Sequence, residues 1–314
     1  MMMTDGDDHH SARFAGEKCL LGSEGSRSAP VRTSMNTPKS LYVAFLFLLA
    51  ILLDGCGQSW YLAGYERDIS SATRAIETAR DNSQRAAAYS RRGSAYSEKA
   101  RYSRAFKLVS TDEYNRLFGL AIQDHDQSIA LEPANAAAYL NRGQAYYDRA
   151  VLETVVDGRL VVSAADQKTW FDPAVADFKK ATERDGRLDR AWDMLGLTHE
   201  TTGELDLAIS EYSQEMTLNV LGRSRLANAY CLRGGSGQRE KKYDAAIADY
   251  EKAIALGATA DDWSCDPYNP LFVIYAQGRR YDQSWEVGHQ GQKSGKWIDP
   301  ELLNRLKKES GRSN

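Results

Sequence analysis

Acidic side chains in two stretches of the chain are the residues most able to do chemistry. Asp112 and Glu113 lie in one stretch, and Glu153 and Asp166 lie in the other. Carboxylates that converge in a pocket can act as general acid and general base, as in a hydrolase or a transferase. No phosphate-binding loop, nucleophile elbow, His-Glu-x-x-His helix or Cys-x-x-Cys motif accompanies them. We therefore expect a non-enzymatic protein without a cofactor, and an enzyme built from these two stretches is the alternative.

Histidine and glycine motifs do not add a metal or nucleotide site. His125 and His199 occupy positions that aromatic residues fill elsewhere in the sequence, so we expect both in the core. No set of residues has metal-ligand spacing. The Gly-Gly-Ser-Gly run at 234–237 lacks the Lys-Ser/Thr that follows the glycines of a phosphate loop. We expect this run to be a flexible or distorted segment.

Two cysteines in the body of the chain raise the question of a disulfide. Cys231 and Cys265 are 34 residues apart, and an oxidising compartment would allow them to pair. Packed helices stand about 8–10 Å apart, however, whereas a disulfide needs Cα atoms within about 7 Å. The spacing alone leaves the bridged and the free forms both open.

The N-terminal region carries the pattern of a targeting signal. Every residue of Leu41–Leu53 is apolar or aromatic, which is shorter than the roughly 20 residues of a membrane span and typical of a signal-peptide core. The run is followed by Asp54-Gly55-Cys56, which resembles a bacterial lipobox, although Asp54 departs from its usual small or apolar residue. The resemblance implies lipidation of Cys56. Because Gly57 rather than Asp follows it, the resemblance also implies an outer-membrane anchor that faces the periplasm.

Composition and periodicity divide the chain further. The 314 residues are 42% hydrophobic and 26% charged, which is enough apolar material for a core. The formal net charge of −3 gives no basic excess to bind nucleic acid. We expect a disordered leader upstream of the true start over 1–34, a signal peptide over 35–55, a tether over 56–64, a helical body over 65–294 and a C-terminal capping helix over 295–314.

The body of the chain repeats. Glycine recurs at Gly93, Gly143, Gly196 and Gly234, separated by 50, 53 and 38 residues, each within an aromatic-x2-Arg/Leu-Gly pattern. Each glycine is followed by an alanine with a ring four positions later: Ala121 with His125, Ala174 with Phe178, Ala208 with Tyr212 and Ala246 with Tyr250. This pattern resembles the tetratricopeptide repeat, a pair of helices of about 34 residues. Insertions account for the longer intervals.

The resemblance implies an all-α fold, namely a right-handed solenoid of helix pairs. Glycine and alanine let the two helices of a pair approach closely, and the rings fill the space between neighbours. A pair cannot bury its apolar face alone, so at least three must stack. Tyr275 and Trp285 indicate a degenerate fifth repeat, and Asp299 followed by Pro300 indicates the start of the final helix.

Two insertions distinguish this chain from the plain repeat. The first lies between Ala100 and Phe118, and Thr111 marks a fresh helix start that should lengthen the second helix of the pair. The second holds Asp-Gly between two β-branched runs over 154–162, which predicts a β-hairpin in the second repeat. Equivalent positions stack in a solenoid, so both insertions should project from one edge and touch. They could form a lip for a partner or simply pack together.

The resemblance also places a partner-binding groove on the first helices of the pairs. In this sequence the groove positions are Leu140, Gln144, Tyr147, Asp148, Arg190, Asp193, Leu197, Glu200, Asn228 and Arg239. The carboxylate clamp of chaperone-binding members is missing, because Ala87, Ser90 and Ser94 occupy its places in the first repeat. Mixed charge and Tyr147 favour a peptide or protein segment as the ligand.

These features together predict a scaffold or adaptor for other proteins of the bacterial cell envelope, with a membrane anchor at Cys56. An enzyme on a repeat scaffold is one alternative. A structural homodimer formed through the end of the solenoid is another, and a solvated inner face with no ligand is the simplest explanation of the groove residues.

Overall fold

The structure is a computed structural model that describes residues 60–156, 159–160, 164–219, 222–257 and 265–311. The chain divides into two units, Met1–Gly55 and Cys56–Asn314, and every described residue lies in the second. The predicted leader, signal peptide and lipidation site at Cys56 therefore lie outside the described residues. Among the residues that are described, no helix has the length and apolar character that crossing a membrane requires.

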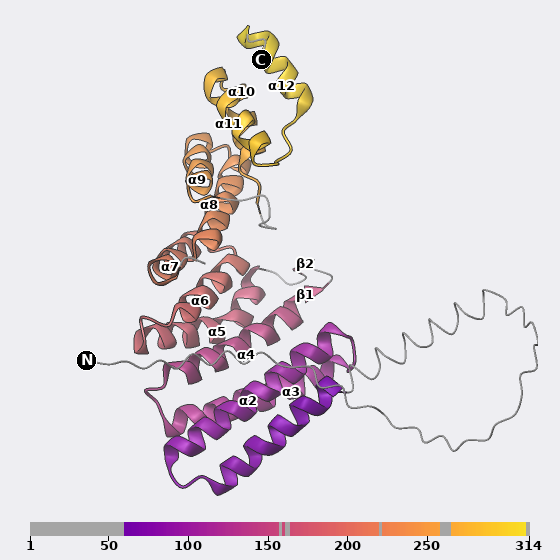
Figure 1. Ribbon diagram of the computed structural model, residues 1–314, viewed down its shortest axis with the longest axis vertical. Coiled ribbons are helices and arrows are strands. Elements are labelled where there is room, and N and C mark those ends of the chain that lie inside the picture. The colour runs from indigo at the N-terminus through magenta and orange to yellow at the C-terminus, as the bar shows by residue number, and fades with distance from the viewer. Residues whose placement is uncertain (1–59, 157–158, 161–163, 220–221, 258–264, 312–314) are drawn as a thin grey trace, which may run out of the picture. The chain divides into compact units, whose positions relative to one another are not determined.

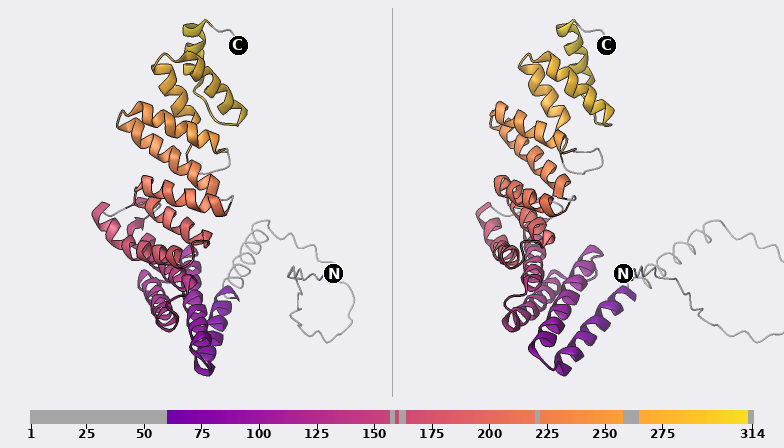
Figure 2. Two further views of the ribbon diagram at one scale, coloured as in Figure 1. Left: turned by 90° about the vertical axis from the view of Figure 1, so that its left-hand side faces the viewer. Right: turned by 60° about the vertical axis from the view of Figure 1, so that its left-hand side comes forward.

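Helices follow one another along the chain, as the repeat pattern predicts (Figures 1 and 2). The leading helix covers residues 60–78. The elements after it are α2 (Asn82–Ala105), α3 (Thr111–Leu131), α4 (Ala136–Thr154), β1 (Val155–Val156), β2 (Arg159–Leu160), α5 (Ala164–Arg184), α6 (Asp189–Thr201), α7 (Leu205–Leu218), α8 (Gly222–Arg239), α9 (Tyr243–Ala255), α10 (Tyr268–Gln277), α11 (Tyr281–Lys293) and α12 (Pro300–Ser310). The four most extensive contacts join α2 to α3, α4 to α5, α8 to α9 and α6 to α7, which are predicted pairs, and α10 pairs with α11 in the same way.

The repeated glycines and rings meet inside each pair. A Cβ atom added at each of the four glycines would lie 3.0 Å or less from the ring of its own repeat: 2.9 Å at Gly93 from His125, 2.8 Å at Gly143 from Phe178, 2.6 Å at Gly196 from Tyr212 and 3.0 Å at Gly234 from Tyr250. All four rings are buried. Only glycine leaves room for the ring at this distance, so the predicted role of the glycine and ring pattern is confirmed.

Replacing Gly196 with alanine is expected to lower the free energy of unfolding by about 1–3 kcal/mol, because the new methyl group overpacks against Tyr212. Gly119→Ala is the matched control. Gly119 lies within α3, and a Cβ atom there would meet nothing within 4 Å. Alanine at that site should raise stability by up to about 1 kcal/mol through helix propensity alone. Urea unfolding measures both, and equal effects would contradict the packing explanation.

A partly buried arginine joins three helices at several of the pairs. Arg142 of α4 donates from Nε and Nη2 to Asp177 of α5 at 2.7 and 2.6 Å, and from Nη1 to Asp126 of α3 at 2.5 Å. The same arrangement recurs as Arg92 with Asp124 and Thr73, and as Arg233 with Asp249 and Asp206. In α6 the equivalent residue is Leu195, so the third pair relies on apolar packing. The sequence pattern shows the arginine but not its partners.

The two insertions lengthen helices and contact each other. α3 begins at Thr111, and the Ser110 hydroxyl accepts the backbone N–H of Glu113 at 3.3 Å, so the predicted helix start in the first insertion is confirmed. Asn115 of α3 donates to Glu153 of α4 at 2.6 Å, which joins the two insertions as predicted.

The predicted β-hairpin is wrong in extent. β1 and β2 pair antiparallel over two residues each, with Val155 opposite Leu160, and the intervening residues 157–158 lie outside the described ones. α4 continues through Thr154, whose hydroxyl donates to the carbonyl of Ala150 at 2.6 Å. The helix thus extends into the β-branched run, because a lone two-stranded pairing is only marginally stable. Apart from this short pairing, the described residues that form regular structure are helical.

The C-terminal part forms a fifth pair and a final helix. In the first four pairs the glycine lies on the first helix and the ring on the second, whereas in the fifth pair the ring lies on α10 and the glycine on α11. A Cβ atom added at Gly288 of α11 would lie 3.1 Å from Phe272 of α10. Asp299 accepts the backbone N–H of Leu302 at 3.3 Å and caps α12, as predicted. Leu302 and Leu306 of α12 pack on Phe272, so this helix covers apolar surface of the fifth pair.

The two histidines lie in the core, as predicted. His125 and His199 are 1% and 2% exposed. Burial, with a further contribution from Arg142, lowers the pKa of His125 to about 4.

The prediction of a flexible or distorted segment at 234–237 is wrong. The run belongs to α8, and Gly234 packs against the Tyr250 ring within this regular helix.

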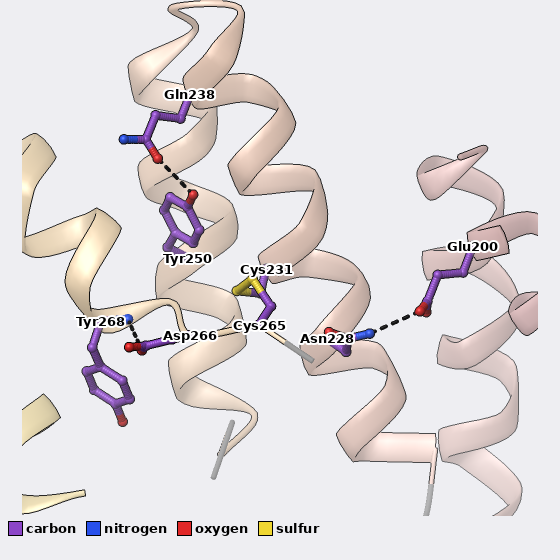
Figure 3. Close-up of a disulfide and its surroundings, with 8 residues drawn as sticks. All are labelled: Glu200, Asn228, Cys231, Gln238, Tyr250, Cys265, Asp266 and Tyr268. Atoms are coloured by element: carbon purple, nitrogen blue, oxygen red, sulfur yellow. Dashed lines mark hydrogen bonds between the residues drawn. A yellow bond between two sulfur atoms is a disulfide. The ribbon is translucent and has the colours of Figure 1, made fainter. Parts of the chain in front are cut away.

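Cys231 and Cys265 form a disulfide, with Cα atoms 5.8 Å apart (Figure 3). Cys231 is buried in α8, whereas Cys265 lies in the segment before α10. The expected helix-to-helix distance does not apply, because one cysteine belongs to a connection rather than to a packed helix. The bridge ties the α9–α10 connection back to α8.

Candidate functional site

Polar side chains on successive first helices contact one another across one face of the structure. The bridging contacts are Ser90–Asn141 (3.3 Å), Arg101–Asp148 (3.1 Å), Gln144–Arg190 (2.7 Å), Tyr147–Thr201 (3.3 Å), Asp193–Arg225 and Glu200–Asn228 (3.1 Å). They join α2 to α4, α4 to α6 and α6 to α8. We call this surface the ladder face. Figure 3 shows the Glu200–Asn228 contact beside the disulfide.

The structure brings most of the predicted groove residues together on the ladder face and leaves three out. Leu140 is 6% exposed and belongs to the apolar core around Phe178, and Leu197 packs against the same core. Arg239 donates to Ser236 within α8 at 2.9 Å. Asn141, one residue after Leu140, contacts Ser90 instead.

A one-residue error in helical register explains the misplaced Leu140. Each residue turns an α-helix by about 100°, so the neighbour of a surface position can lie in the core. The prediction missed Asn141 and Arg225 of the ladder face, although helical periodicity could have identified them. Asn141 lies three residues before Gln144, and Arg225 lies three residues before Asn228. Arg101 had no such signal, since it lies in the lengthened end of α2.

Acidic groups gather where α6, α7 and α8 meet. Asp193 pairs with Arg225, and Glu200 accepts from Asn228 and from the Tyr212 hydroxyl at 3.2 Å. Burial raises the pKa of Asp193 and of Glu200. Burial first, and Asp193 second, raise the pKa of Glu215 to about 7, against the opposing effect of Arg225. Acidic groups outnumber this arginine, which favours a cationic group on a ligand.

A partly buried carboxylate, Asp148, lies at the α2 end of the ladder face. Asp148 contacts Arg101, which also pairs with Glu98. Burial raises the pKa of Asp148 to about 6, while Arg101 lowers it and Glu98 raises it. Arg101 therefore favours the charged form of Asp148, and Arg101 itself is held between two carboxylates.

A hollow of about 480 Å³ adjoins the Ser90–Asn141 contact. Its polar lining includes Tyr65 and Ser71 of the leading helix, Ser90 and Ser94 of α2, and Asn141 of α4. Asp68, Arg91 and Glu98 line it as well, so the hollow offers both neutral and charged groups to a peptide. The hollow extends the ladder face beyond the residues predicted from the repeat pattern.

The carboxylates of the enzyme alternative do not form an acid–base pair among the described side chains. Glu113 is held by Arg116 at 2.7 Å, which lowers the pKa of Glu113, and Glu153 accepts from Asn115. Asp112 is exposed, and the side chain of Asp166 lies outside the described set. No group of three or more metal-ligating side chains occurs within the described part of the chain. The arrangement on the ladder face fits binding better than proton transfer.

Comparison with known proteins locates one repeat directly. Residues 227–256, which span most of α8 and α9, match the tetratricopeptide repeat family. A comparison with curated proteins found no significant match.

Solved structures with a similar fold include the nuclear import adaptor Nro1 of S. pombe. It superimposes with a TM-score of 0.55 at 11% identity, covering 81% of this chain and 93% of that one. This likeness shows a shared helical fold. TTC0263, a tetratricopeptide repeat protein of Thermus thermophilus, gives a TM-score of 0.36 at 21% identity, with 71% and 94% coverage. YrrB, a tetratricopeptide repeat protein with an unusual peptide-binding site, gives a TM-score of 0.41 at 16% identity, with 76% and 97% coverage.

Proposed function

We propose that this protein is a non-catalytic adaptor that binds an extended polypeptide segment along the ladder face. The observation that carries the proposal is the ladder itself, in which polar groups of α2, α4, α6 and α8 form one surface next to an open hollow. An extended segment can exchange its backbone and side-chain polar groups with such a row. Proteins of the tetratricopeptide repeat family generally serve as protein-interaction scaffolds, which supports this assignment.

The bound segment should carry basic side chains toward its α8 end. Asp193, Glu200 and Glu215 are close to Arg225, and all three carboxylates have raised pKa values. A lysine or arginine of the ligand would stabilise their charged forms. Toward α2, the hollow combines the neutral polar groups of its serines and Asn141 with the charged side chains of Asp68, Arg91 and Glu98, so a segment of mixed polarity fits there.

The proposal also places the protein at the cell envelope, with Cys56 as a lipidated N-terminus on the periplasmic side of the outer membrane. The apolar run Leu41–Leu53 ahead of Cys56, and Gly57 after it, support this placement. The Cys231–Cys265 disulfide also supports an oxidising compartment. The partners would then be other envelope proteins.

Arg190→Glu tests the ladder face. Arg190 is exposed and bonds to Gln144, so reversing its charge should alter the face without opening the core. Chemical crosslinking in intact cells followed by affinity purification should recover an amount of the main partner that differs about tenfold from the wild type, because the reversed charge lies on the binding surface; a tenfold change corresponds to about 1.4 kcal/mol. Arg184→Glu, the same change at an exposed residue of α5, is the control and should recover the wild-type set. Equal recovery from both variants would rule out the ladder face as the binding surface.

Cys56→Ser tests the anchor separately. The variant should leave the membrane fraction and appear in the soluble fraction, because a lipid anchor contributes about 0.8 kcal/mol for each buried methylene group. Membrane fractionation with detergent extraction measures the shift. If the wild type and the variant fractionate identically, the anchor is wrong, whereas the ladder-face proposal stands on its own experiment.

A further inference from the structure

Aromatic side chains form a continuous cluster where the leading helix begins and α2 ends. Tyr102 lies at its centre, with its ring centroid 5.3 Å from Tyr61, 5.9 Å from Tyr65 and 4.7 Å from Phe106. Trp60 packs edge-on against Tyr61 at 5.4 Å. We call these five residues the aromatic surface. The contacts hold together residues that are about 40 positions apart in the sequence.

The outer members of the aromatic surface are open to solvent. Trp60 is 65% exposed, Tyr61 is 52% exposed and Phe106 is 50% exposed. Scattered exposed apolar residues are ordinary, but a contiguous aromatic patch marks an interaction surface. Arg104 and Lys107 flank Phe106 in the sequence, so basic groups border the rings. Rings with a polar edge beside basic side chains are typical of the headgroup region of a bilayer.

The chain itself places this surface close to any anchor at Cys56. Trp60 lies four positions after Cys56, a distance of at most about 14 Å when fully extended. A protein held at Cys56 therefore keeps Trp60 within reach of the membrane surface, and no comparable constraint acts on the α12 end.

We propose that the aromatic surface inserts into the headgroup region of the phospholipid bilayer. The inference rests on the proposed anchor at Cys56 and adds a second contact that fixes the orientation of the protein. Trp60, Tyr61 and Phe106 bury their rings among the upper acyl chains, and Arg104 and Lys107 meet anionic lipid phosphates. The leading helix and α2 then stand at the membrane rather than swinging on a loose tether.

Tryptophan fluorescence of the full-length lipidated protein tests this contact. The chain has six tryptophans, and Trp60 and Trp297 are almost equally exposed at 65% and 64%. The protein is mixed with vesicles of phosphatidylethanolamine and phosphatidylglycerol that contain, or lack, a lipid with brominated acyl chains. The difference between the wild type and Trp60→Phe isolates the Trp60 signal, and the difference from Trp297→Phe isolates the matched control.

The expected result is a Trp60 signal that shifts to the blue on vesicle addition and loses roughly half its intensity to the brominated lipid, while the Trp297 signal stays unchanged. Flotation of the vesicles reports attachment in the same samples. Attached protein with no greater quenching at Trp60 than at Trp297 would overturn the aromatic contact and leave the anchor intact. Protein that fails to float would overturn the anchor and this inference together. A Trp60 signal already blue-shifted without vesicles would show that another part of the chain or a second copy covers the surface, which also overturns it.

Discussion

Reducing the Cys231–Cys265 disulfide is expected to lower the free energy of unfolding by about 4 kcal/mol. The bridge closes a loop between residues 34 positions apart, and losing it releases about that much conformational entropy in the unfolded chain. Cys231 is fully buried in α8, and the disulfide also holds the approach to α10. Unfolding in urea with and without a thiol reductant measures the change.

The variant Cys231→Ser with Cys265→Ser is the control for the reductant. It should have the lower stability of the reduced protein and should not respond to reductant at all. A wild-type protein whose stability is unaffected by reductant, and in which both thiols titrate before reduction, would contradict the bridge.

Replacing Arg142 with leucine is expected to cost about 3–5 kcal/mol of stability, because it leaves a buried carboxylate without its cation. Asp177 has 3% of its side chain exposed and receives two hydrogen bonds from Arg142. The same guanidinium also holds Asp126, so the substitution loosens α3, α4 and α5 together. In the third pair, Leu195 of α6 occupies the equivalent position, so leucine is compatible with the helix backbone there and the expected loss comes from the unpaired carboxylate.

A double variant separates the charge effect from the loss of packing. Arg142→Leu with Asp177→Ala removes the unpaired charge, and it should recover part of the loss seen in the single variant. Urea unfolding of the two single variants and the double variant completes the cycle. If Arg142→Leu costs less than about 1 kcal/mol, the three-helix contact is not a main contributor to stability.

The helix pairs were predictable because their signal is local and repeated. A glycine and a ring recur at fixed intervals, as in Gly93 with His125 and Gly196 with Tyr212, and this combination predicts that two helices approach closely there. The structure confirms both close approaches. The ion pairs were less accessible. Arg142 is visible in the pattern, but Asp177 and Asp126 become its partners only when α3, α4 and α5 stack.

The candidate binding surface was predicted in outline. Gln144, Tyr147 and Arg190 lie on the ladder face, whereas Leu140 lies in the core because a helix changes face within one residue. The hollow beside Ser90 and Asn141 could not be predicted, since its lining combines residues of the leading helix, α2 and α4 that meet only in the folded chain.

The sequence by itself determined that helix pairs recur and which small and aromatic residues pack within them, because helical periodicity and side-chain size are written in neighbouring residues. Tertiary structure alone decided that Cys265 comes within reach of Cys231, that the β-branched run after Thr154 forms so short a strand pairing, and that Trp60 and Phe106 share one surface. Each of these features depends on how the helices pack and bring residues that are distant in the sequence together, and a local sequence pattern does not contain that information.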